Sequence, residues 1–207
     1  MKFQLSALFF GLAATTVSAQ YNQTGPFYLH ITGKEGSSID GYAGSCHAGA
    51  AIEGLCYSAG ALPQGSTSFQ YYFNYTSYNK VGDDDAGELI WRLHYNDQDG
   101  NPAYVEQAAG LQYQINSNVA APMFGFSSNF LIGFDGAKKL FGYNYYDDAT
   151  FVPGQNPTPN GEGKAYYQWY VCWQYFTGYY YQSVGWVTDG APHNPTCEPV
   201  DIVQEFA

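Results

Sequence analysis

Short runs of alternating or aromatic-rich side chains recur along the chain, and each run is bounded by glycine or proline. After the first nineteen residues, no segment of useful length places its apolar side chains at the period of a helix. Alternation over about four to eight positions is typical of strands. We therefore expect an all-β fold, an antiparallel sandwich or barrel. The expected strands are residues 27–31, 69–75, 88–95, 111–115, 129–134, 139–145, 166–176, 179–187 and 200–206.

Turn signals separate several of these runs. Asp135-Gly136 predicts a tight turn between two strands, and the proline- and glycine-rich residues 153–163 predict a loop within one domain. Thr177-Gly178 predicts a hairpin turn inside the densest aromatic stretch, residues 165–187.

This hairpin would place Trp169 opposite Trp186 on one face, which we expect to pack into the core. The other face carries tyrosines among smaller side chains. Because tyrosine combines a large rigid contact area with a polar tip, this face is the better candidate for recognition. The candidate binding residues there are Tyr170, Tyr179 and Tyr181.

The four cysteines allow three disulfide connectivities, and pairing is the default in an exported chain. We expect Cys46 to pair with Cys56 and Cys172 with Cys197, because each pair closes a local loop between neighbouring expected strands. The sequence leaves the other connectivities open. Zinc binding is the alternative, but the chain has no CxxC spacing, and oxidising export disfavours free thiolates.

Residues 1–19 predict a secretory signal peptide, with a charge at Lys2, an apolar run and a small-residue end at Val17-Ser18-Ala19. Residues 20–207 then form one secreted β domain with a sizeable core. The apolar run is shorter than the roughly 20 residues that a membrane helix needs. We expect a secreted, extracellular protein without membrane insertion, and the sequence leaves free diffusion and association with a cell wall both open.

The sequons at Asn22 and Asn74 predict N-glycosylation in a eukaryotic secretory pathway. A glycosylated asparagine must face solvent, so both side chains are expected at the surface.

The chain is acidic, with 7 Lys+Arg against 18 Asp+Glu and a formal net charge of -11. This balance repels nucleic-acid phosphates and favours a basic partner or simple solubility. The acids are dispersed except for Asp83, Asp84 and Asp85, which we expect in a solvated loop. A weak cation site, or contact with a basic partner, is the alternative for this triplet.

The sequence contains no recognisable catalytic constellation. There is no GxSxG elbow, and His47 beside Cys46 is an adjacency in sequence, which is different from a nucleophile–base pair. Residues 95–106 partly match a calcium loop, but Tyr95 occupies its first position and the flanks look like strands. We therefore expect no enzyme activity, no cofactor and no metal.

Three segments, CHAGAAIEGLC (46–56), YYQWYVCWQY (166–175) and NPTC (194–197), resemble a group of small secreted fungal proteins with four cysteines. That group looks related to the hypersensitive-response elicitors released by plant-pathogenic fungi, and it supplies no agreed catalytic residues. The resemblance implies an abundant extracellular protein that plants perceive and that binds a host or wall component.

Two non-catalytic functions are compatible with these features, and an enzyme that a glycosidase or esterase screen would detect is the third class. The first is a secreted, non-enzymatic elicitor or effector that acts by surface recognition, with a basic plant apoplastic defence protein as partner. The alternative is a structural protein of the fungal cell wall that binds carbohydrate through exposed tyrosines.

Overall fold

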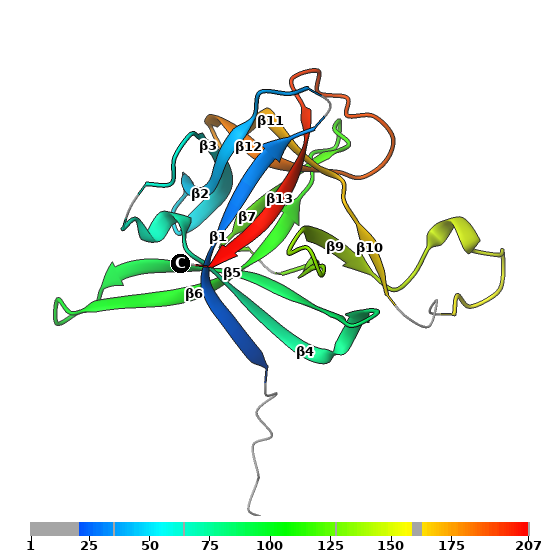
Figure 1. Cartoon of the computed structure of the whole chain (residues 1–207), viewed down its shortest axis with the longest axis horizontal. Helices are drawn as coiled ribbons and strands as arrows, with labels where there is room; N and C mark the ends of the chain where they lie inside the picture. Colours follow the sequence, from blue (N-terminus) through cyan, green and yellow to red (C-terminus); the bar gives the residue numbers. More distant parts are fainter. Residues whose placement is uncertain (1–20, 35, 64, 127, 159–162, 207) are drawn as a thin grey trace, which may run out of the picture.

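The computed structural model describes residues 21–34, 36–63, 65–126, 128–158 and 163–206 (Figure 1). The predicted signal peptide lies outside the described residues. Within them the fold is all-β, as expected, and includes two short 3-10 segments, η1 (Thr67–Phe69) and η2 (Asp148–Thr150). The strands are β1 (Asn22–Gly33), β2 (Asp40–Gly49), β3 (Ile52–Ala59), β4 (Tyr71–Val81), β5 (Asp84–Asn96), β6 (Pro102–Gln112), β7 (Val119–Phe124), β8 (Leu131–Phe134), β9 (Leu140–Asn144), β10 (Lys164–Tyr166), β11 (Trp169–Phe176), β12 (Tyr179–Val187) and β13 (Glu198–Phe206).

Nine strands close an antiparallel barrel, so the barrel alternative is the correct one. Around the ring the order is β5, β4, β1, β13, β11, β12, β3, β7 and β6, and pairing of β6 with β5 closes it. Strand β2 pairs with both β1 and β3. Closure removes the unpaired edges of an open sheet.

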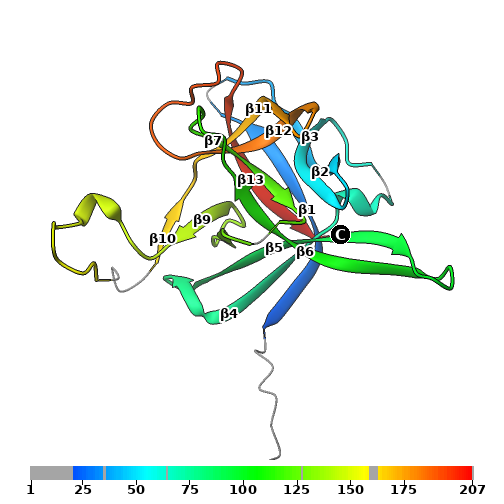
Figure 2. The ribbon, with the colours of Figure 1, turned by 180° about the vertical axis from the view of Figure 1, so that it is seen from behind.

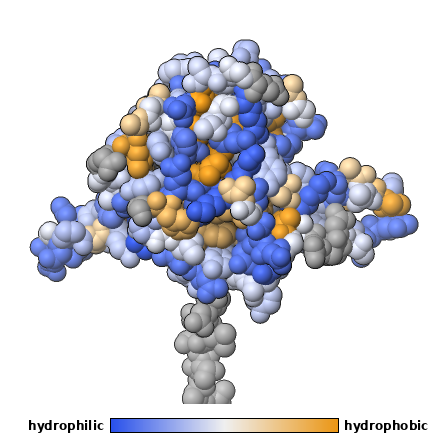
Figure 3. Space-filling model, in the orientation of Figure 1, coloured by the Kyte–Doolittle hydropathy of each residue, from blue (hydrophilic) through white to orange (hydrophobic). Residues whose placement is uncertain are grey.

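The core fills the barrel with apolar side chains from alternate strand positions. Phe27, Leu29 and Ile31 of β1 are fully buried, and Ile202 lies opposite Ile31 on β13. Complete burial of such side chains contributes about 1.5–3 kcal/mol each. Figure 3 shows hydrophilic residues over most of one face, with smaller apolar areas between them.

The predicted hairpin of β11 and β12 is present, in the predicted register, with Trp169 opposite Trp186. Thr177 and Gly178 both have positive φ, 50° and 95°, as a two-residue type I′ turn requires. Trp169 and Trp186 are buried with their rings edge to face, 4.8 Å apart. The tryptophan face is therefore core at this end of the hairpin.

The Asp135-Gly136 turn is also confirmed. The Asp135 carboxylate accepts hydrogen bonds from the backbone N–H groups of Ala137 and Lys139, both at 2.9 Å. Lys138, rather than Gly136, takes the left-handed backbone conformation, with φ 63°.

Other strand predictions were wrong. β2, β3 and β7 were missed, and residues 111–115 include only the end of β6. Phe69 belongs to η1, and residues 166–176 divide between the end of β10 and β11.

Strand β5 exchanges partners along its length. Ala86 and Gly87 pair with β8, whereas β5 pairs with β6 from Ile90 onward. Strands β8, β9 and β10 therefore form a three-stranded extension that diverges from the barrel wall. Figure 2 shows the β9–β10 loop and the tip of the β5–β6 hairpin on opposite sides of the molecule. No helix in the described part of the chain is long and apolar enough to cross a membrane.

Candidate binding groove

An open groove of about 590 Å³ lies where the β8–β9–β10 extension diverges from the ends of β6 and β12. Asn129 fixes the boundary of the groove between β6 and β8. Its side-chain amide accepts from the backbone N–H of Leu111 at 2.8 Å and donates to the C=O of Leu111 at 3.2 Å. The amide thus replaces a backbone partner just before β8. The groove is lined by Leu111, Tyr113, Asn129, Phe130, Leu131, Gly142, Tyr143, Asn144, Tyr145, Tyr146, Asp147, Asp148, Phe151, Tyr166, Gln168, Trp186 and Thr188.

The floor of the groove is aromatic and tightly packed. The ring of Phe130 lies 5.2 Å from that of Trp186 and 5.8 Å from that of Trp169, in edge-to-face geometry. Gly142 gives Trp186 the room it occupies, because a Cβ there would lie 2.5 Å from the indole. A glycine in β9 is therefore what allows the tryptophan to reach the floor.

One wall is a row of aromatic rings at the end of β9 and in the loop after it. Tyr145 lies 6.5 Å from Tyr143 and 4.5 Å from Tyr146, and Tyr146 lies 6.4 Å from Phe151. Tyr145 and Phe151 are 46% and 52% exposed, so a large part of each residue is accessible to a ligand. Burial, and then the neighbouring Tyr145, raise the pKa of Tyr143 above its ordinary value.

Polar groups hold this wall in place. The side-chain oxygen Oδ1 of Asn144 accepts from the backbone N–H of Tyr145 at 2.9 Å. Asp147 caps η2 by accepting from the N–H of Ala149 at 3.2 Å, and its other oxygen lies 3.4 Å from Lys164 Nζ of β10. The Lys164 ammonium therefore balances one groove carboxylate, and Asp148 remains exposed at the rim.

Chemically, the groove offers ring faces beside hydroxyl, amide and carboxylate groups. Among the described residues that line it there is no serine, cysteine or histidine. The described residues also contain no group of three or more His, Cys, Asp or Glu placed to hold a metal ion. Its volume falls within the roughly 300–1,000 Å³ of typical small-molecule sites. The arrangement suits non-covalent binding of a ligand that has both flat apolar faces and polar edges.

Comparison with protein families gives one result. Residues 24–206 match the model of a domain of unknown function, DUF7907. The chain belongs to the DUF7907 family. No match was found among curated proteins or among solved structures.

The tyrosines predicted for recognition lie outside the groove of this DUF7907 domain. Tyr179 and Tyr181 stack on each other at 5.9 Å and are half-buried, and Tyr179 also contacts His47 edge to face at 5.2 Å. Tyr170 lies in a separate place, packed against the buried cluster of Val119, Cys172 and Val187. The structure thus does not bring the three tyrosines into one site.

Both predicted disulfides are present in the DUF7907 domain, Cys46–Cys56 and Cys172–Cys197. Cys46–Cys56 joins β2 to β3, and Cys172–Cys197 ties β11 to the segment before β13. Two disulfides are compatible with an extracellular protein.

The two sequon asparagines differ in exposure. Asn22 is exposed, as expected. Asn74 is only 9% exposed, and its side-chain oxygen accepts from Gln23 Nε2 at 2.7 Å. The expectation that Asn74 faces solvent is therefore wrong, because its position in β4 turns the side chain toward a hydrogen-bond network.

The acidic triplet lies in the β4–β5 hairpin, where only Asp83 belongs to the turn. Asp84 and Asp85 are half-buried residues that begin β5, and Asp85 pairs with Lys80 at 3.0 Å. Partial burial, followed by the charges of Asp135, Asp83 and Asp85, raises the pKa of Asp84. The expectation of a solvated loop thus holds for Asp83 alone.

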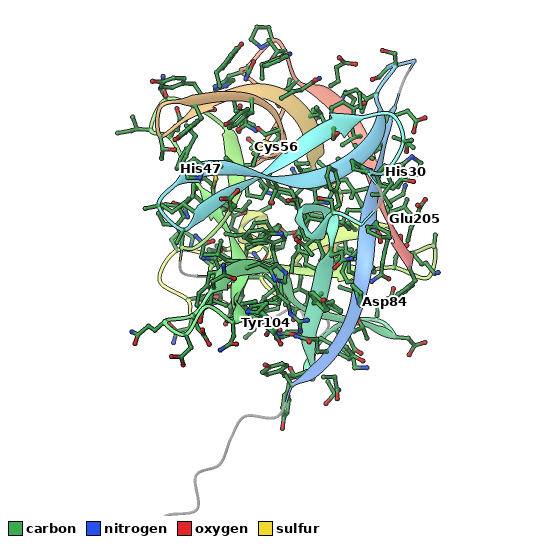
Figure 4. The ribbon with its side chains drawn as sticks, turned by 90° about the vertical axis from the view of Figure 1, so that its left-hand side faces the viewer. His30, His47, Cys56, Asp84, Tyr104 and Glu205 are labelled. Atoms are coloured by element: carbon green, nitrogen blue, oxygen red, sulfur yellow. A yellow bond between two sulfur atoms is a disulfide. The ribbon has the colours of Figure 1, made fainter. Side chains whose placement is uncertain are left out.

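His30 and His47 lie far apart. Figure 4 shows His30 close to Glu205 and distant from His47. His30 contacts Asp40 through Nε2 at 2.8 Å and Glu205 through Nδ1 at 3.1 Å, so both ring nitrogens already have partners.

Sequence reasoning missed the groove residues. The usable signal was the run of tyrosines and aspartates at 143–148, which begins in the expected strand 139–145 and continues past its end. Their meeting with Trp186 depends on strand order, which the sequence does not give.

Proposed function

We propose that this DUF7907 domain is a secreted, non-catalytic binding protein whose groove takes a neutral carbohydrate chain. The observation that carries the proposal is the row of rings Tyr143, Tyr145, Tyr146 and Phe151 standing over a floor of Trp186. A pyranose has a flat face of C–H groups and a rim of hydroxyls. Aromatic faces pack against the first, and phenol, amide and carboxylate groups bind the second.

The charges near the groove favour a neutral ligand. Asp147 is paired with Lys164, and Asp148 is the one remaining carboxylate among the described lining residues. A phosphorylated ligand or nucleic acid would meet carboxylates without a free cation to bind it. A basic defence protein would find little concentrated negative charge here, so the groove supports the carbohydrate alternative better than the charge-based partner. Perception by plants stays a prediction from the resemblance to the elicitors.

The proposal is tested by titrating the purified protein with soluble oligosaccharides of β-glucan and of chitin in a calorimeter. Stacking on one aromatic ring contributes about 1–3 kcal/mol for nucleic-acid bases, and we expect a similar contribution for sugars. Tyr145→Ala and Tyr146→Ala should therefore each weaken binding by about fivefold or more.

Tyr78→Ala is the matched control, because Tyr78 is 91% exposed and does not line the groove. It should bind like the unmodified protein. If no oligosaccharide binds, or if the control loses as much affinity as the groove variants, the proposal fails.

A further inference from the structure

The far end of the β11–β12 hairpin carries a second set of exposed rings. Trp173, Tyr175 and Tyr180 lie on the face that buries Trp169 and Trp186 nearer the barrel, yet they are 43%, 64% and 59% exposed. Tyr175 lies directly opposite Tyr180, and the rings of Trp173 and Tyr180 are 5.2 Å apart with an interplanar angle of 30°. We call these three residues the hairpin platform.

The backbone of β11 under the platform is held by side chains from other segments of the chain. Trp173 donates its N–H to Thr196 Oγ1 at 3.0 Å, and its C=O accepts from Asn194 Nδ2 at 2.8 Å. The neighbouring disulfide ties the same two segments together. Two residues further along β11, Gln114 Nε2 donates to the C=O of Tyr175 at 2.8 Å. Because these contacts are made within the protein itself, the strand that carries Trp173 and Tyr175 is already ordered before any ligand arrives, which lowers the entropic cost of binding.

A hollow of about 270 Å³ adjoins these rings, and its polar lining includes Gln114, Ser117 and Asn194. None of the described residues that line it carries a charge, although the chain has a net charge of -11. A basic protein, a phosphate or a metal ion would find no complementary charge there. The lining matches a neutral ligand with apolar faces and hydroxyl edges.

We propose that the hairpin platform is a second carbohydrate-binding site, in which a sugar ring stacks on Trp173 and Tyr180. The ligand class is that of the groove, so this inference rests on the proposed function. The platform and the groove share no lining residue. One molecule can therefore engage two points on a polysaccharide, or two neighbouring chains.

Two weak sites on one rigid molecule have a measurable consequence. Binding to a polymer becomes tighter than binding to a short oligosaccharide, because the second contact forms at a high effective concentration, with gains of about 10²–10⁴ in favourable geometry. Retention on insoluble β-glucan or chitin should thus exceed what the affinity for an oligosaccharide implies.

The test compares the full secreted chain with a platform variant, Trp173→Ala with Tyr180→Ala, and a groove variant, Tyr145→Ala with Tyr146→Ala. Calorimetry with a short oligosaccharide should give two sites for the unmodified protein and one for each variant. Co-sedimentation with the insoluble polymer should fall by at least about tenfold in both variants. Trp173→Phe with Tyr180→Phe keeps the rings and should restore both readouts, and circular dichroism reports whether each variant is folded.

The outcomes separate the two proposals. If the groove variant loses all binding while the platform variant keeps full retention, the platform inference is overturned and the groove proposal stands. If the platform variant alone loses binding, the groove proposal fails and the platform stands. If no glycan binds, both are overturned. If sedimentation velocity shows that the platform variant changes only self-association, the platform is a contact between copies, and the inference is again overturned.

Discussion

Replacing Tyr71 with phenylalanine should stabilise the barrel. Tyr71 is 0% exposed, its ring stacks on Phe124 at 6.0 Å, and its hydroxyl has no hydrogen-bond partner among the described residues. Burial accordingly raises the pKa of this phenol above its ordinary value. An unsatisfied buried polar group costs about 1–3 kcal/mol. The void left by one oxygen, about 10–15 Å³, costs roughly 0.3 kcal/mol at about 24 cal/mol per Å³. The net gain for Tyr71→Phe is therefore about 1 kcal/mol or more.

Urea unfolding followed by tryptophan fluorescence measures this change. The midpoint should rise at constant slope, and Tm should increase by about 2–4 °C for each kcal/mol in a chain of this size. Tyr57→Phe is the matched control, since the Tyr57 hydroxyl donates to the C=O of Asp40 at 2.9 Å and accepts from its N–H at 3.0 Å. That change should lower the free energy of unfolding by about 1 kcal/mol. If both substitutions destabilise the protein equally, the Tyr71 hydroxyl has a partner and the reasoning is refuted.

Three further predictions concern stability and the groove floor. Replacing Cys172 and Cys197 together with serine should cost about 3–4 kcal/mol, more than loss of the disulfide that closes the shorter loop, as thermal unfolding would show. Gly142→Ala should cost about 1–3 kcal/mol and alter the near-ultraviolet circular dichroism of the groove tryptophan, whereas Gly136→Ala, which meets nothing within 4 Å, should do neither. Partial burial opposes ionisation of Asp201, but hydrogen bonds from two lysines outweigh it and lower its pKa below the ordinary 3.8. The free energy that ionised Asp201 contributes to the folded state is complete above its ordinary pKa and is lost as pH falls through the lower folded pKa. Asp201→Asn should therefore make the free energy of unfolding depend less on pH in the acid range. An unchanged slope of the free energy of unfolding against pH below about pH 4 would contradict this.

Alternation, turn chemistry and local cysteine spacing predicted part of the fold well. The β11–β12 register followed from the turn at Thr177-Gly178, because a two-residue turn leaves no freedom in pairing. The two cysteine pairs were predictable for a related reason, since each joins segments close in sequence.

The missed strands carry small side chains for reasons that only the packed structure reveals. β2 has the sequence DGYAGSCHAG, which has little strand propensity. Its Gly41 lies against the backbone of β3 so closely that a Cβ would clash with the C=O of Ser58, and a Cβ at Gly44 would lie 2.8 Å from the Phe69 ring. β7, with the sequence VAAPMF, is buried at every position and so shows no alternation.

The candidate sites were harder to predict than the strands. Trp173 and Trp169 occupy the same face of one strand, and the pattern expects both in the core. Strand β13 pairs with β11 at Tyr170 and Val171 and does not extend alongside Trp173. The exposure of Trp173 thus depends on where a strand that is far away in the sequence begins, and the local sequence does not contain this information.

The pairing of β1 with β13, from Phe27 opposite Phe206 to Gly33 opposite Val200, constrains the order of events during biosynthesis. A chain that emerges amino-terminus first cannot complete its ring until β13 has emerged, so the earlier strands must wait with unsatisfied edges. Long-range pairings of this kind also slow folding. Closure of this barrel therefore waits for its last strand, and until β13 is available the edge of β1 that it will cover stays open to other partners.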